Sequence, residues 1–252
     1  MPAFNLDELK KETATENRYE RRLAKLVADN HQVDRIKSAV ESAVTNFKNG
    51  DRSFFIYGEP QSGKTEMMIA LTAKLLDLGF KLVIVLLNDS VQLLGQNLER
   101  FQRSGLSPAP KRFSEVLPPE VTIGEHQWVI FCKKNSKDLQ KLLEKIEDHS
   151  NRVIIDDEAD YATPNSKINR QEKSRINELT EKLIGDQGIY IGVTATPGRL
   201  DLNRTHKNEN ECWIDFAPHS NYTGQGVFFP LFNDTGDLPY SLTQRRELYS
   251  DP

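Results

Sequence analysis

Hydrophobic residues near the start of the chain recur at intervals of three and four, which is the spacing of one face of a helix. They are Leu23, Leu26, Val27, Val33, Ile36, Val40, Val44 and Phe47. Asn30, in the polar stretch "ADNHQ", interrupts this pattern and is a candidate helix cap. We therefore expect two helices here, the second of which ends at "KNGD", residues 48–51.

Beyond this region, short runs of almost continuous hydrophobic residues alternate with helical patterns. The runs predict strands at residues 53–57, 81–87, 121–123, 128–132, 152–156 and 189–195. The helical patterns lie at residues 65–79, 90–103, 136–149 and 169–185. The stretch "SGLSPAPKRF", residues 104–113, is interpreted as a loop. Apolar strands that alternate with helices are typical of a parallel sheet covered on both faces, so the predicted fold class is α/β.

The regular alternation stops after Pro197. The residues that follow are rich in Asn, Gly, Pro and aromatic side chains, and they predict a long irregular segment with one short strand. We divide the chain into a helical extension at residues 1–50, an α/β lobe at 51–200 and an irregular segment at 201–252. We expect the last segment to pack on the lobe or toward a second lobe.

The composition excludes several classes of protein. The 252 residues are enough to form a core, and the net charge of −4 gives no overall basic excess that would indicate a nucleic-acid partner. Cys132 and Cys212 lie far apart without neighbouring Cys or His at metal-ligand spacing, which argues against a disulfide or zinc site. The chain shows no signal segment and no run of about 20 apolar residues, so we expect a cytoplasmic protein with no membrane partner.

The first chemical motif is "GEPQSGKT", residues 58–65, between a predicted strand and a predicted helix. Such a loop turns its backbone N–H groups around a phosphate, its lysine reaches the outer phosphates, and its threonine binds Mg²⁺. The alternative is a strand–turn–helix joint with an incidental lysine. The candidate nucleotide-binding residues, for ATP with Mg²⁺ at Thr65, are Gly58, Glu59, Pro60, Gln61, Ser62, Gly63, Lys64, Thr65 and Glu66.

A second motif, "DDEAD" at residues 156–160, follows an apolar strand. A parallel sheet places carboxylates at such a strand end on the same edge as the phosphate loop, and we expect them beside it. We assign Asp157 as a ligand of Mg²⁺ and Glu158 as the base that accepts the proton of the attacking water. The alternative is an acidic helix cap.

A third motif, "TATP" at residues 194–197, ends the last predicted strand. We expect the hydroxyls of Thr194 and Thr196 to hydrogen-bond to Asp160 or Glu158 and to couple the site to the state of the γ-phosphate. An ordinary strand end is the alternative.

Further candidates rest on position alone. Gln32 lies upstream of the phosphate loop and is a candidate to bind the adenine of ATP; a solvated residue at the start of a helix is the alternative. Loops after two predicted strands carry polar residues suited to nucleic-acid phosphates, although a solvated polar loop explains them equally well. These residues are Asn88, Gln92, Gln96, Lys133, Lys134 and Asn135.

The three motifs resemble motifs I, II and III of superfamily-two helicases and translocases. More narrowly, the chain is similar to the bacterial Z-one domain over about residues 52–232. The segments that carry this resemblance are "QSGKT" (61–65), "LGFKLVIVLL" (78–87), "KKN" (133–135), "IDDEAD" (155–160) and "YIGVTATP" (190–197). The resemblance implies the first RecA-like lobe of an ATPase that acts on nucleic acid in restriction or phage defence. DNA is favoured over RNA as that nucleic acid.

The resemblance also implies a second lobe that supplies an arginine finger. The sequence after Pro197 shows neither that lobe nor an arginine pair in a helical context. Because an arginine finger contributes about 10³ to 10⁵ in rate, we expect this chain to bind ATP and hydrolyse it slowly. The alternative function is an ATP-dependent switch that docks a partner protein. The sequence offers no separate carboxylate cluster for a nuclease, so cutting would require a partner or another domain.

Overall fold

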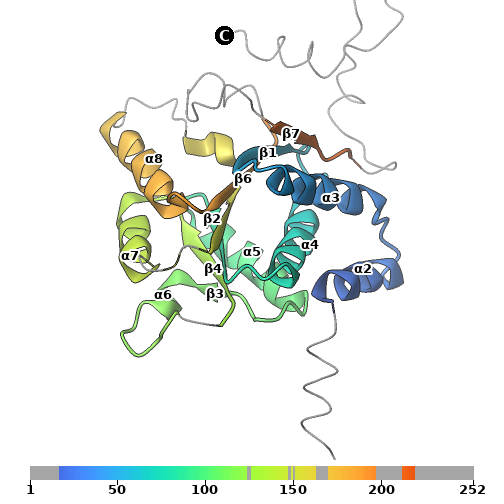
Figure 1. Ribbon diagram of the computed structural model, residues 1–252, viewed down its shortest axis with the longest axis horizontal. Helices are drawn as coiled ribbons and strands as arrows, with labels where there is room; N and C mark the ends of the chain where they lie inside the picture. The colour runs from blue at the N-terminus through green and yellow to red at the C-terminus, as the bar shows by residue number, and fades with distance from the viewer. Residues whose placement is uncertain are drawn as a thin grey trace, which may run out of the picture.

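The computed structural model describes residues 17–123, 126–146, 149, 151–162, 170–196 and 212–218. They form a seven-stranded sheet in the order β3-β4-β2-β5-β6-β1-β7, in which every pair is parallel. Helices cover both faces of the sheet (Figure 1). The predicted α/β class, with helices at the N-terminal side, is confirmed.

The strands agree with the predicted pattern except in one segment. They are β1 Ser53–Tyr57, β2 Leu82–Leu87, β3 Lys111–Arg112, β4 Trp128–Lys133, β5 Arg152–Asp157, β6 Ile189–Thr194 and β7 Cys212–Asp215. The strand predicted at residues 121–123 is wrong, because Val121 closes a turn through its N–H to the carbonyl of Pro118. Strand β3 lies in the predicted loop, and both of its residues are exposed. It is a strand because it pairs with β4, and no apolar pattern in the sequence marks it. Strand β7 is the short strand expected after Pro197.

Six of the described α-helices lie at predicted positions, whereas the short helix α6 and the 3₁₀ turn η1 were not predicted. The helices are α2 Arg18–Ala28, α3 Asp34–Lys48, α4 Lys64–Asp77, α5 Val91–Arg103, α6 Phe113–Val116, α7 Ser136–Ile146 and α8 Arg170–Ile184, with the 3₁₀ turn η1 at Ala159–Ala162. No helix in the described ranges is long and apolar enough to cross a membrane.

Asn30 ends α2, as its position in the sequence predicts. It has a left-handed φ of 61°, and its N–H donates to the carbonyl of Val27 at 3.0 Å. The next N–H, of His31, donates to the carbonyl of Leu26 at 2.8 Å. This pair of bonds satisfies carbonyls at the helix end that would otherwise lack partners.

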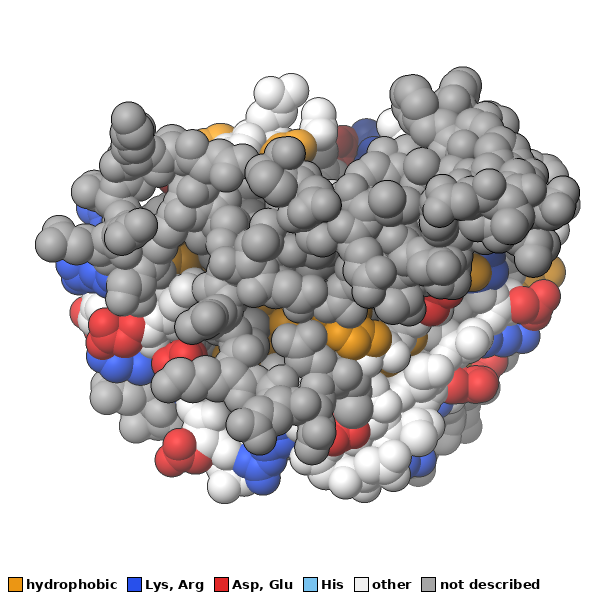
Figure 2. Space-filling view, turned by 90° about the horizontal axis from the view of Figure 1, so that it is seen from above, with side chains coloured by type: hydrophobic (Ala, Val, Ile, Leu, Met, Phe, Trp, Pro, Cys, Tyr) orange, Lys and Arg blue, Asp and Glu red, His pale blue; other side chains and the backbone are white. Residues whose placement is uncertain are grey.

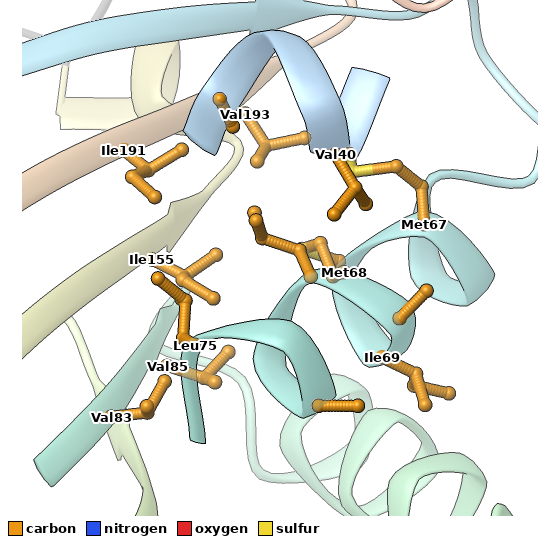
Figure 3. Packing of buried hydrophobic residues seen from close by; sticks show 14 of the residues in the cluster. Val40, Met67, Met68, Ile69, Leu75, Val83, Val85, Ile155, Ile191 and Val193 are labelled. Carbon is orange, nitrogen blue, oxygen red and sulfur yellow. The ribbon is translucent and has the colours of Figure 1, made fainter. Parts of the chain in front are cut away.

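Two hydrophobic cores lie on opposite faces of the sheet, because alternate side chains of each strand point to opposite sides. On one face, α4 packs between α3 and the sheet, with Met68 against Ile155, Ile191 and Val193 (Figure 3). Nine residues of α4 are buried, which explains why this helix has no polar face. The other face buries α7 and α8.

Phe55 connects β1 to both neighbouring strands. Its ring stacks on Trp213 of β7 at a centroid distance of 5.1 Å and meets Tyr190 of β6 edge-on at 5.9 Å. Gly192 pairs with Phe55 across the sheet, and a Cβ on this glycine would lie 2.4 Å from the ring. The ring therefore occupies space that only a glycine leaves open.

A pair of glycine substitutions tests this packing. We expect Gly192→Ala to lower the free energy of unfolding by about 1–3 kcal/mol, because the ring of Phe55 must move. Gly95→Ala, inside α5, is the control: its Cβ would meet Arg112 at an ordinary 3.6 Å, and alanine favours a helix over glycine by up to about 1 kcal/mol. Urea unfolding should therefore give shifts of opposite sign, and equal shifts would contradict the role of Gly192.

Candidate active site

The phosphate-loop motif forms a tight turn between β1 and α4. Two of its residues, Gln61 and Gly63, have left-handed φ values of 60° and 94°. Gly58 lies under the loop, where a Cβ would come within 3.0 Å of Phe216 and 3.1 Å of Lys64. A side chain at this position would therefore crowd the neighbours of the loop, which favours glycine here.

Lys64 is folded onto the loop that precedes it. Its Nζ donates to the carbonyls of Gly58 and Glu59, each at 2.9 Å. Burial lowers the pKa of Lys64, and the carboxylates of Asp157 and Glu158 oppose this effect. Phosphate oxygens would be stronger partners for the ammonium group than these neutral carbonyls.

The acidic motif lies at the same edge of the sheet, although not immediately beside the loop. Strand β6 runs between β1 and β5, so that Tyr57 pairs with Thr194 and Asp157 with Val193. The prediction that the carboxylates share the edge with the loop is thus confirmed, with one strand between them. The N–H of Gly58 donates to the carbonyl of Thr194 at 3.0 Å and ties the loop to β6.

The two acidic residues differ in environment. Burial, with the neighbouring charge of Glu158 as a smaller cause, raises the pKa of Asp157 to about 6. Glu158 is exposed and has a left-handed φ of 53°. A carboxyl group with a raised pKa holds its proton more tightly than usual, because burial disfavours its charged form, and a nearby cation would favour that charged form again.

Magnesium fits the donors at this edge. Within the described ranges no group of three or more His, Cys, Asp or Glu residues could hold a metal ion. Mg²⁺ is typically held by one or two protein oxygens together with water and substrate phosphates. Asp157 and the hydroxyl of Thr65, in the first turn of α4, suit that pattern, whereas Zn²⁺ would require a denser set of ligands.

The hydroxyls of the third motif bond to Asp160, as the sequence predicts. Thr194 Oγ1 donates to one carboxylate oxygen of Asp160 at 2.7 Å, and Thr196 Oγ1 donates to the other. Asp160 and Thr194 are both buried. This arrangement links β6 to the turn after β5; Pro197 lies outside the described residues.

The six nucleic-acid candidates divide into two groups. Gln92, Gln96, Lys133 and Asn135 are at least partly exposed, and both Lys133 and Asn135 contact Asp89, at 2.8 and 3.0 Å. Asn88 and Lys134 are instead buried, at 8% and 6% exposure. Lys134 could have been found from strand alternation, because it lies two residues after Cys132, whose side chain is in the core.

Gln32 lies at the N-terminal side of α3, which approaches the phosphate loop through Arg35. Arg35 Nη1 donates to the carbonyls of Ser62 and Ala217, both at 3.0 Å, and its guanidinium lies 5.0 Å from the ring centroid of Phe216. Gln32 itself is exposed. The sequence analysis missed Arg35 and Phe216, since only the fold brings α3 and the end of β7 to the loop.

Glu66 has a partner that the sequence analysis also missed. Arg22 of α2 forms an ion pair with Glu66 in the first turn of α4, and the Arg22 side chain is only 9% exposed. The pair attaches the helical extension to the helix that carries Lys64. Glu66 therefore already has a protein partner at the entrance of the site.

Comparison with known proteins identifies the family. Residues 27–199, well over half of the chain, match the family described as "ResIII: Type III restriction enzyme, res subunit". The chain belongs to the ResIII family. ResIII domains are RecA-like, helicase-like ATPase domains, so the coarser resemblance drawn from the motifs is confirmed. A comparison with curated proteins finds no significant match.

Two solved structures resemble part of this ResIII chain. One is the "ATP-dependent Type ISP restriction-modification enzyme LlaBIII bound to DNA", at 22% identity and a TM-score of 0.48, covering 65% of this chain and 12% of that one. The other is a "nuclease-deletion mutant of the Type ISP restriction-modification enzyme LlaGI in complex with a DNA substrate mimic", at 18% identity and a TM-score of 0.49, covering 73% and 17%. The chain thus spans less than a fifth of either protein.

Removing the buried carboxylate should change the pH dependence of stability. The pKa of Asp157 is about 6 in the folded protein and 3.8 in an ordinary aspartate. Between pH 3.8 and 6 the folded state therefore binds more protons than the unfolded state. Above pH 6 the folded state must hold the ionised carboxylate, which lowers the free energy of unfolding. We expect Asp157→Asn, without Mg²⁺, to raise the free energy of unfolding by about 1–3 kcal/mol near pH 7.5. The gain should vanish below about pH 4. Urea unfolding at both pH values checks this, and a gain independent of pH would contradict it.

Proposed function

We propose that this chain is the ATP-binding lobe of a superfamily-two helicase- or translocase-like ATPase that acts on nucleic acid, DNA above RNA, in a bacterial restriction or phage-defence system. The finer similarity to the Z-one domain is part of this proposal. One observation carries it: a phosphate loop, an acidic motif and a hydroxyl motif meet at one edge of the sheet, where Thr194 bonds both to Gly58 of the loop and to Asp160 of the acidic motif.

In the proposed reaction, the backbone N–H groups of residues 58–63 and the ammonium of Lys64 bind the phosphates of ATP. Thr65 and Asp157 hold Mg²⁺, which neutralises phosphate charge when it is bound. Glu158 orients the attacking water and accepts its proton. Asp160 transmits the state of the site to Thr194 and Thr196 of β6.

The family description supports DNA as the nucleic acid, since restriction enzymes act on DNA. The exposed candidates for its backbone are Gln92, Gln96, Lys133 and Asn135. Among the described residues visible in Figure 2, Lys and Arg side chains lie beside Asp and Glu side chains and form no patch of one sign. Tight binding of DNA would therefore need additional basic surface, which a second RecA-like lobe or a nuclease partner could supply.

The second candidate function is a switch in which bound ATP controls the docking of a partner protein. The net charge of −4 and the mixed surface favour it over a strongly nucleic-acid-binding protein. Both functions use the same ATP site, and they differ in whether DNA changes the rate of hydrolysis.

Two substitutions test the assignment of the site. We expect Lys64→Ala to reduce ATP affinity at least 100-fold, because the loop loses the ammonium group that would pair with the phosphates. Glu158→Gln should keep ATP affinity within about threefold and lower the single-turnover rate at least 100-fold. Titration with a fluorescent ATP analogue and rapid-quench hydrolysis measure the two effects. Retained hydrolysis in Glu158→Gln would remove Glu158 from its role as base.

The rate of the purified chain tests the need for a second lobe. We expect ATP to bind in the presence of Mg²⁺ and to be hydrolysed slowly, at well below 1 s⁻¹, because an arginine finger typically contributes about 10³ to 10⁵ in rate. Steady-state hydrolysis with and without double-stranded DNA is the measurement. Robust turnover stimulated by DNA in this chain alone would contradict the expectation, and stimulation in a longer protein that includes a second lobe would favour the motor over the switch.

A further inference from the structure

Two adjacent lysines after β4 have opposite surroundings. Lys133 is partly exposed and bonds to Asp89 at 2.8 Å, whereas the side chain of Lys134 is 3% exposed. A lysine is almost never this buried unless its charge is paired. The groups that pair with the ammonium of Lys134 therefore indicate the role of this residue in the protein.

All side-chain partners of Lys134 that the structure shows lie at the end of β5. Its Nζ forms an ion pair with Asp156 at 2.8 Å and donates to the carbonyls of Asp157 and Glu158 at 2.9 and 2.7 Å. Asp156 is in turn held by the hydroxyl of Tyr190 at 2.9 Å. The ammonium group thus makes two hydrogen bonds and one ion pair, and all three partners lie at the end of β5.

These bonds explain the backbone of Glu158. A left-handed φ in a residue other than glycine is unfavourable and persists where the surrounding structure holds it. Lys134 binds the carbonyl on each side of that unfavourable φ, those of Asp157 and Glu158. The lysine therefore fixes the direction in which both acidic side chains leave the chain.

Asn88, at the end of β2, holds the side chain of Glu158. Its Nδ2 donates to Glu158 Oε2, and Asn88 is only 8% exposed. The amide nitrogen must face the carboxylate, because the amide oxygen would be repelled by it. Asn88 thus complements Lys134: one residue holds the carboxylate, and the other holds the backbone.

We propose that Lys134 and Asn88 are positioning residues of the ATP site, and that neither contacts nucleic acid. Lys134 sets the backbone that presents Asp157 to Mg²⁺, and Asn88 sets the carboxylate of Glu158. This inference rests on the proposed function. It corrects the expectation that both residues face nucleic acid, since their polar groups are turned into the protein.

The experiment separates metal binding from nucleotide binding. We expect Lys134→Met to raise the Mg²⁺ concentration at half-saturation about 10- to 100-fold in a titration with a fluorescent ATP analogue, as typical residues behind a metal ligand do. Binding of the same analogue in EDTA should change less than threefold. Lys137→Met, which removes an exposed lysine from the first turn of α7, should behave like the unchanged protein.

Asn88→Ala provides a second variant that is less disruptive to folding, because it leaves the buried ion pair intact. We expect the single-turnover rate to fall about 10-fold or more while the affinity for ATP and Mg²⁺ stays within about threefold. Asn97→Ala on α5 is the control. Thermal unfolding followed by circular dichroism shows whether each variant is folded, and if Lys134→Met is not, Asn88→Ala decides the inference.

The outcomes distinguish the inference from the proposed function. If the unchanged protein binds no ATP with Mg²⁺, the proposed function fails and the inference fails with it. If it does bind, and the two variants match their controls, the inference alone is overturned. The variants could instead bind double-stranded DNA more weakly while their Mg²⁺ dependence and hydrolysis rate stay unchanged. That result would indicate that the residues contact nucleic acid, and it would also overturn the inference.

Discussion

The burial of a parallel sheet on both faces is the constraint on which this structure depends. Because helices cover the two faces, the strands must be apolar along their length, and polar groups can collect only at the strand ends. Parallel strands bring all their carboxyl ends to the same edge. The phosphate loop, the acidic pair and the hydroxyl motif therefore meet although about 140 residues separate the first from the last.

The same edge concentrates charge, and the structure balances it locally. Asp156 and Asp157 end β5, and Glu158 and Asp160 follow it directly. Lys134 neutralises the innermost of them, two threonines bind the last, and the pKa of Asp157 is raised, chiefly by burial. A cation at this carboxylate would relieve part of that cost, which is why the arrangement suits a site that takes up Mg²⁺ together with ATP.

The helical extension also contributes to the site. Arg22 of α2 pairs with Glu66, and Arg35 of α3 binds the carbonyl of Ser62 in the loop and that of Ala217 after β7. Segments far apart in the sequence are thus attached to one loop. These contacts within the protein help to hold the loop in its turn, which lowers the cost of ordering it when a ligand binds.

Motif spacing and hydrophobic period were enough to predict the α/β class, the phosphate loop and the acidic strand end, because each depends on residues close together in the chain. The strand at 121–123 was mispredicted, since an apolar residue in so short a run can enter the core singly, as Ile123 does, without strand pairing. Strand alternation can separate the directions of Lys133 and Lys134, but the tertiary structure decided their partners: β4 lies beside β2 in the sheet, and Lys134 meets Asp156 while Lys133 meets Asp89. The sequence determined which chemical groups are present at the edge, and the packing of the sheet decided which of them face the acidic pair.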